Sequence, residues 1–80
     1  MEKIYSSLNE IFRDVFDDDD IVVNAETTSK DIEGWDSLAN INLIVIIENE
    51  FGFKFKMNEI TGMKNVGEMA SIISERATTL

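Results

Sequence analysis

A serine at the start of an apolar run is the residue best placed to do chemistry in this chain. Ser37 follows Asp36 and precedes Leu38, and mostly apolar residues continue to Ile47. The chain has no cysteine and no histidine, so we expect any chemistry it takes part in to depend on a group attached to it. A helix beginning at Asp36 or Ser37 presents unpaired N–H groups and the positive end of its dipole, both favourable to a phosphate. The pattern therefore indicates a serine suited to carrying a phosphate group.

The length and composition limit the number of domains and the class of fold. Eighty residues suffice for one small domain, so we expect residues 1–80 to form a single domain. Apolar residues make up 44% of the chain, enough for a core, and proline is absent while glycine is scarce. This composition favours helices joined by ordered loops. The lack of cysteine excludes a disulfide scaffold and a thiolate metal site.

The charge excludes several classes of partner. Sixteen acidic residues against seven basic ones give a net charge of −9, which repels nucleic acid and anionic membranes. Proteins with basic patches are the expected partners. The N-terminus lacks the features of a signal peptide, and the run Leu43–Ile47 is too short to span a bilayer. We expect a cytoplasmic monomer that does not insert into membranes.

Hydrophobic periodicity predicts a first helix that ends near the four aspartates at 17–20, whose charges oppose the helix dipole. A long first loop then runs to Asp36, and a loop of this length is usually functional or held by apolar anchors. The expected anchors are Ile21, Val22, Val23, Ile32 and Trp35.

The second helix is predicted from Asp36 or Ser37 to about Glu50, and its apolar side chains surround it. Leu43, Ile47 and Phe51 fall on one side, whereas Leu38, Ile41 and Val45 fall on nearly the opposite side. A helix that is apolar all round is normally fully buried, which an 80-residue protein can hardly achieve. The second set is therefore expected to face a partner or a ligand.

Shorter elements complete the chain. Gly52 is a predicted C-cap, residues 53–56 an extended loop with aromatics in the core, and residues 58–61 a single turn of helix. A last helix begins at Asn65, with Glu68 completing a capping box, and residues 78–80 should fray. The sum is an all-α, small four-helix bundle of three main helices plus one short helix, with a long first loop.

Several of these residues together resemble the acyl carrier protein family. Asp36-Ser37-Leu38 is similar to the family's Asp-Ser-Leu motif and stands, as in the family, after a long loop at the head of the second helix. The segment 47–52 resembles the family's end of that helix, and residues 66–69 resemble the start of its last helix. The resemblance covers nearly the whole chain.

The resemblance implies a mechanism. Ser37 would carry 4′-phosphopantetheine as a phosphodiester, installed from coenzyme A by a phosphopantetheinyl transferase that uses magnesium, with Asp36 and Leu38 completing the motif. The arm's thiol would hold an acyl group as a thioester. The chain would then be no enzyme but a carrier for acyl-loading, condensing or acyl-transfer enzymes with basic docking patches, in fatty acid, other lipid or secondary-metabolite biosynthesis.

The second helix departs from the pattern of fatty-acid carriers. Ala39, Asn42 and Asn49 stand where those carriers usually have acidic residues, and Trp35 replaces a small residue. These differences indicate a specialised, stand-alone carrier whose second helix attracts basic partners less strongly. The residues expected to contact partners are Trp35, Ile41, Val45 and Glu48, although Trp35 is also a natural loop anchor.

Other interpretations remain open at this point. Ser37 is also a good helix N-cap, in which case the chain is an acidic, non-enzymatic interaction module. A hydrolase using Ser37 lacks a histidine base. The aspartate run does not form a calcium loop, because Val22 stands where that loop needs glycine. The cargo, which could be fatty acyl, polyketide or aminoacyl, is not determined by the residues.

Overall fold

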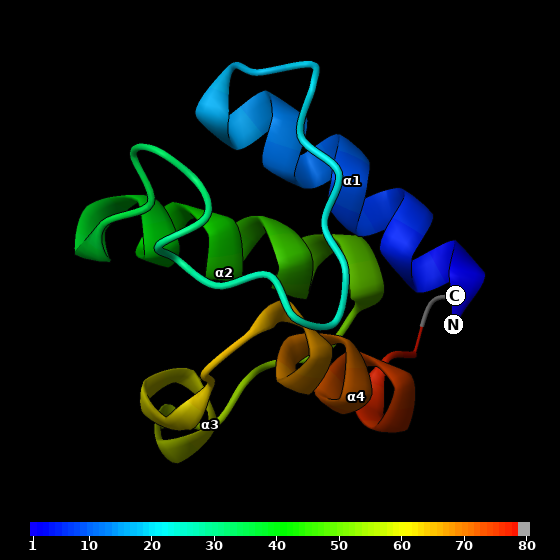
Figure 1. The fold of residues 1–80 in the computed structure, drawn as a ribbon. Coiled ribbons are helices and arrows are strands. Elements are labelled where there is room, and N and C mark those ends of the chain that lie inside the picture. The colour runs from blue at the N-terminus through cyan, green and yellow to red at the C-terminus, as the bar shows by residue number, and fades with distance from the viewer. Residues whose placement is uncertain (79–80) are drawn as a thin grey trace.

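The computed structural model describes residues 1–78 and shows four helices (Figure 1). They are α1 (Glu2–Phe16), α2 (Ser37–Phe51), α3 (Met57–Gly62) and α4 (Val66–Arg76). The described residues contain no strand. Helix α1 packs on both α2 and α4, and the long loop between α1 and α2 crosses one face of the bundle (Figure 1). The prediction of three main helices and one short helix is confirmed.

Helix α1 buries one stripe and ends where the aspartate run begins. Ile4, Leu8 and Phe12 are buried, in agreement with the three- and four-residue spacing of the sequence. Asp17 ends the helix in the left-handed conformation, with φ 50°, and its N–H bonds to the Arg13 carbonyl. The charge run therefore starts outside the helix, where it opposes the dipole less.

Helix α2 has one apolar side that is buried and another that is exposed. Leu43, Ile47 and Phe51 are buried in the core, whereas Leu38, Ile41 and Val45 are exposed. Gly52 ends the helix with φ 70°, a conformation that glycine adopts without steric cost. The predicted division of this helix into a core side and an outer side is confirmed.

The buried core is one cluster built from α1, the long loop, α2, the segment after α2 and α4, and Ile60 of α3 packs against it. Phe55 enters it from the extended segment after α2, and Phe53 packs edge-on against Phe55 with ring centroids 4.8 Å apart, as predicted for these aromatics. The buried members are Ile4, Leu8, Ile11, Phe12, Val23, Ile32, Leu43, Ile44, Ile47, Phe51, Phe55, Val66, Met69, Ala70 and Ile73.

The ends of α4 differ from the prediction in two details. The Asn65 side chain caps the helix by accepting the Glu68 N–H at 2.9 Å, but the Glu68 carboxylate accepts the N–H of Lys64 rather than that of Asn65. Fraying at Thr78 was a wrong expectation. Its N–H donates to the Phe51 carbonyl at 3.0 Å and its hydroxyl to the Gly52 carbonyl. Residues 79–80, also expected to fray, lie outside the described residues.

Candidate functional site

Ser37 is the first residue of α2, and its side chain is exposed. The N-cap is its neighbour Asp36, whose Oδ1 accepts the Ala39 N–H at 2.9 Å, while the Asp36 carbonyl accepts the Asn40 N–H. The sequence left open which of the two residues caps the helix. Asp36 is the residue that caps the helix. The Ser37 hydroxyl therefore does not act as a cap, and it makes no hydrogen bond within residues 1–78.

The surroundings of this hydroxyl suit a phosphate. The N–H groups of Ser37 and Leu38 lie at the open end of α2 and have no acceptor among residues 1–78. These N–H groups and the positive end of the helix dipole stabilise an anion placed there. A phosphodiester on Ser37 therefore fits the local electrostatics.

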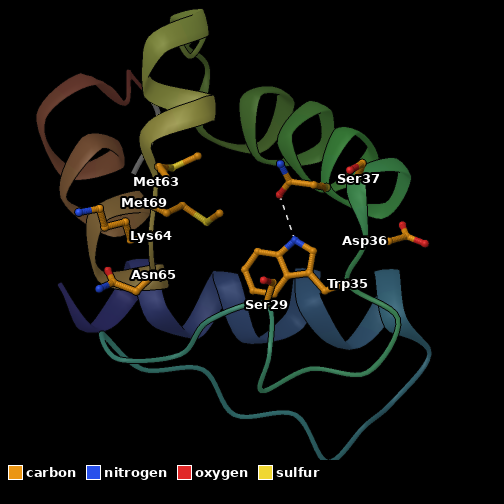
Figure 2. A pocket seen from close by; sticks show the side chains of 9 residues that line it. Ser29, Trp35, Asp36, Ser37, Met63, Lys64, Asn65 and Met69 are labelled. Carbon is orange, nitrogen blue, oxygen red and sulfur yellow. Dashed lines mark hydrogen bonds between the residues drawn. The ribbon is translucent and has the colours of Figure 1, made fainter.

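Trp35 holds the residues just before α2 against α1. Its indole ring packs edge-on against Phe12, with centroids 5.2 Å apart, and also against Phe16. The indole N–H donates to Oδ1 of Asn40 at 3.0 Å, one turn into the helix (Figure 2). Trp35 is thus the loop anchor that its size suggested, and its contact with a partner remains a prediction.

The long loop is held at several points before it reaches the serine. Val23 and Ile32 are buried, and the Val23 N–H donates to Asn9 of α1 at 2.7 Å. The first N–H groups of α4 bond to loop carbonyls: Val66 to Thr27 at 2.9 Å and Gly67 to Ala25 at 3.0 Å. Of the five predicted anchors, only Val22 is wrong, because its side chain is exposed. These contacts position the start of α2 relative to α1 and α4.

A cavity of about 320 Å³ opens beside Ser37 (Figure 2). Met63 and Met69 lie on one side of it and Trp35 on the other. Its lining combines hydroxyl and amide groups with thioethers, a mixture that matches an arm containing both amides and methylenes. The lining residues are Ser29, Trp35, Asp36, Ser37, Asn40, Met63, Lys64, Asn65 and Met69.

Sequence reasoning did not find the far wall of this cavity. Ser29, Met63 and Met69 come from the long loop, the segment after α3, and α4. No periodicity links positions on such separate segments, so only the fold brings them to the serine. Met69 is also buried in the core.

The predicted partner residues occupy different places on α2. Leu38, Ile41 and Val45 are exposed and lie on the same side, beginning next to Ser37. Glu48 lies near the other end of the helix and is half-buried, and its Oε2 accepts the Phe55 N–H at 2.8 Å. The structure therefore brings the apolar candidates to the serine and gives Glu48 a bond that holds the loop after α2.

Two structural observations bear on other classes of function. Within residues 1–78, no three acidic side chains are grouped so that they could hold a metal ion. In the same part of the chain, no helix has the length and apolar content needed to cross a bilayer.

Comparison with known proteins agrees with this geometry. The family described as "Phosphopantetheine attachment site" matches residues 6–73. The solution structure of a holo acyl carrier protein from Geobacter metallireducens is 44% identical, covers 90% of this chain and 83% of its own, and superposes with a TM-score of 0.85. This chain belongs to the acyl carrier protein family. No curated protein sequence matches it significantly.

Membership settles the class of activity. Acyl carrier proteins carry phosphopantetheine and are carriers without catalysis of their own, so this carrier is not an enzyme. The bound arm supplies the thiol that a cysteine-free chain lacks.

Proposed function

We propose that Ser37 is the residue that carries 4′-phosphopantetheine and that the chain acts as a stand-alone, cytoplasmic and monomeric carrier. The single observation that supports this most is the exposed Ser37 hydroxyl at the open end of α2, released from capping by Asp36. Asp36 holds the helix start, and Leu38 continues the motif on the exposed side of α2. The matched family region includes all three residues.

The modification follows from the chemistry of the hydroxyl. A phosphopantetheinyl transferase with magnesium joins Ser37 Oγ to the phosphorus of the phosphopantetheine group of coenzyme A. The bond from that phosphorus to the adenosine bisphosphate half breaks, and the serine proton passes to a base of the transferase. The N-terminal N–H groups of α2 then stabilise the phosphodiester. The cavity beside Ser37 gives the first part of the arm a surface to lie on.

The carrier then holds acyl groups as thioesters and delivers them to acyl-loading, condensing or acyl-transfer enzymes in lipid or secondary-metabolite biosynthesis. The net charge of −9 supports partners with basic surfaces, because it steers their encounter at long range. The neutral residues Ala39, Asn42 and Asn49 support a dedicated pathway distinct from general fatty acid synthesis.

Intact mass spectrometry tests the attachment residue. The purified chain is incubated with coenzyme A, magnesium and a broad-specificity phosphopantetheinyl transferase. We expect the mass of one phosphopantetheine to be added to the wild type and to Ser29→Ala, but not to Ser37→Ala. Ser29 is the matched control because it is an exposed serine that lines the same cavity. A modified Ser37→Ala, or an unmodified wild type whose circular dichroism shows it folded, would refute the assignment.

A further inference from the structure

Asn40 offers an unused hydrogen-bond donor to the cavity beside Ser37. Its side chain is half-buried, lines the cavity and accepts the Trp35 indole N–H through Oδ1 at 3.0 Å. Because an indole N–H can only donate, this bond fixes the orientation of the amide and leaves Nδ2 with two N–H groups. They make no hydrogen bond within residues 1–78, and no buried side-chain nitrogen of that range lacks a partner, so Nδ2 is accessible from outside.

Asn65 repeats this arrangement on another wall of the cavity. Its Oδ1 accepts the Glu68 N–H at 2.9 Å, as the N-cap of α4, and its Nδ2 makes no hydrogen bond within residues 1–78. Lys64, the next lining residue, has a side chain that can only donate. The side-chain amide oxygens of the cavity are therefore used within the protein, whereas its amide N–H groups are free. An occupant has to bring hydrogen-bond acceptors.

The apolar part of the lining consists of two thioethers and one aromatic ring. Met63 and Met69 lie on one side of the cavity and Trp35 on the other (Figure 2). Met69 is 2% exposed and belongs to the core, so it closes the inner end of the cavity. Methionine side chains are flexible and adapt to irregular ligand surfaces. The cavity of about 320 Å³ is at the small end of ligand sites and suits short apolar segments placed between acceptors.

The phosphopantetheine arm has this chemistry, because amide carbonyls alternate with methyl and methylene groups along it. We propose that the cavity is the resting site of the arm on this carrier. Asn40 and Asn65 donate through Nδ2 to carbonyl oxygens of the arm, and Met63 and Met69 pack against its apolar groups. This inference rests on the proposed function, in which the arm is attached to Ser37 at the edge of the same cavity.

Trp35 is the positioning residue of this site. Its ring is held against Phe12 and Phe16 of α1, with centroids 5.2 Å and 6.1 Å apart, and its N–H holds the Asn40 amide. Without that N–H, the amide could turn its oxygen instead of its nitrogen toward the cavity. A partner enzyme has to draw the arm away from these residues before it uses the thiol.

NMR spectroscopy of the apo and holo forms tests the contact directly. The chain is labelled with 15N and, in its methionine methyl groups, with 13C, and is converted with unlabelled coenzyme A by a phosphopantetheinyl transferase. We expect the Asn40 side-chain amide signals and the Met63 and Met69 methyl signals to shift on conversion. Isotope-filtered NOEs should join these two methyl groups to the arm.

Two residues outside the cavity are matched controls for these signals. Met57 of α3 is 74% exposed and does not line the cavity, so its methyl signal should stay in place. Asn9 of α1 also accepts an N–H through Oδ1, here from Val23 at 2.7 Å, and its amide signals should not shift.

Substitution of Asn40 measures its share in holding the arm. Conversion to the holo form should raise the melting temperature of the wild type by about 5 °C, because the new contacts exist only in the folded state. In Asn40→Leu, which adds no charge and suits a helix, this rise should fall to about half. Trp35→Phe, which frees the Asn40 amide, should give an intermediate rise. Asn42→Leu is the matched control, because Asn42 is exposed on α2 and does not line the cavity, and its rise should equal that of the wild type.

Three results would contradict this scheme in different ways. Shifts confined to the backbone around Ser37, without NOEs to Met63 or Met69, would show an arm extended into solvent and overturn the proposal. Equal rises for Asn40→Leu and Asn42→Leu would remove Asn40 from the site. The wild-type spectra decide the question even where a variant fails to fold. A wild type that gains no phosphopantetheine by intact mass refutes the proposed function itself, and is distinct from both results.

Discussion

The indole N–H of Trp35 donates to Oδ1 of Asn40 at 3.0 Å and so joins the last loop residue before the N-cap to the first full turn of α2. The same indole ring packs on Phe12 and Phe16 of α1. One side chain therefore connects the two longest helices at the point where Ser37 is presented. This arrangement fixes the start of α2, where the proposed attachment residue Ser37 lies.

Two substitutions of Trp35 should separate the contributions of its hydrogen bond and of its ring packing to the free energy of unfolding. Trp35→Phe retains aromatic packing but loses the hydrogen bond, and should lower the free energy of unfolding by about 1 kcal/mol. Trp35→Ala also loses the ring packing, and should cost about 3 kcal/mol. Urea unfolding followed by circular dichroism measures both. Equal losses in the two variants would mean that the ring contributes nothing beyond its N–H.

The close approach of α4 to the long loop depends on Gly67. A Cβ atom added there would lie 2.8 Å from the Ala25 carbonyl oxygen, which accepts the Gly67 N–H. Gly67→Ala should therefore displace the loop and cost about 2 kcal/mol, in the range of overpacking. Thermal unfolding provides the measurement.

Gly62 provides the matched control for that substitution. Nothing lies within 4 Å of a Cβ added at Gly62, so Gly62→Ala should leave stability unchanged or raise it by about 0.5 kcal/mol. Equal stability of Gly67→Ala and Gly62→Ala would contradict the close packing of the loop on α4.

The sequence sufficed for the local features of the fold. The helix types, the end of α1 near Asp17 and the two sides of α2 depend on spacing and capping residues, which a reader of the chain can recognise. The choice of Asp36 over Ser37 as the N-cap could not be predicted, because both side chains cap helices well.

Features that join distant segments were beyond sequence reasoning. The cavity beside Ser37 has walls from the loop, α2 and α4, and no spacing rule relates Ser29 to Met69. Thr78 was expected to fray as a near-terminal residue, but its bonds to Phe51 and Gly52 hold it. Glu48 was predicted to contact partners, and its bond to the Phe55 N–H could not be foreseen because it depends on where the segment after α2 returns.

Glu59 of α3 is linked to α4 by an ion pair with Arg76. The Lys56 N–H donates to Glu59 Oε1 at 2.7 Å, and this bond, together with the nearby Arg76 guanidinium, holds the pKa of Glu59 below its ordinary value of 4.5. A pKa that is lower in the folded state means that Glu59 contributes stability above about pH 4.5, and that this contribution is lost as the pH falls through the folded-state value.

Glu59→Gln should therefore be less stable than the wild type near neutral pH, and the difference should shrink as the solution is acidified. Urea unfolding at a series of pH values measures it. Glu10→Gln, at an exposed position of α1, allows the general effect of removing one negative charge to be subtracted. A difference that stays constant from neutral to acidic pH, after that subtraction, would contradict the assigned linkage.

Self-repulsion should limit the stability of this carrier at low salt. The net charge is −9, and the four exposed aspartates at 17–20 gather at the C-terminal end of α1, where negative charge is unfavourable. Added salt should therefore raise the melting temperature. Asp19→Asn should reproduce part of this effect by raising the free energy of unfolding by about 0.5 kcal/mol at low salt, and its advantage over the wild type should disappear at high salt.

Glu2→Gln is the opposing control. Glu2 lies in the first turn of α1, where negative charge is favourable, so its loss should lower the melting temperature. Thermal unfolding by circular dichroism at two salt concentrations tests all three proteins. A wild-type melting temperature that is independent of salt would mean that the acidic groups are spaced widely enough for solvent to screen them.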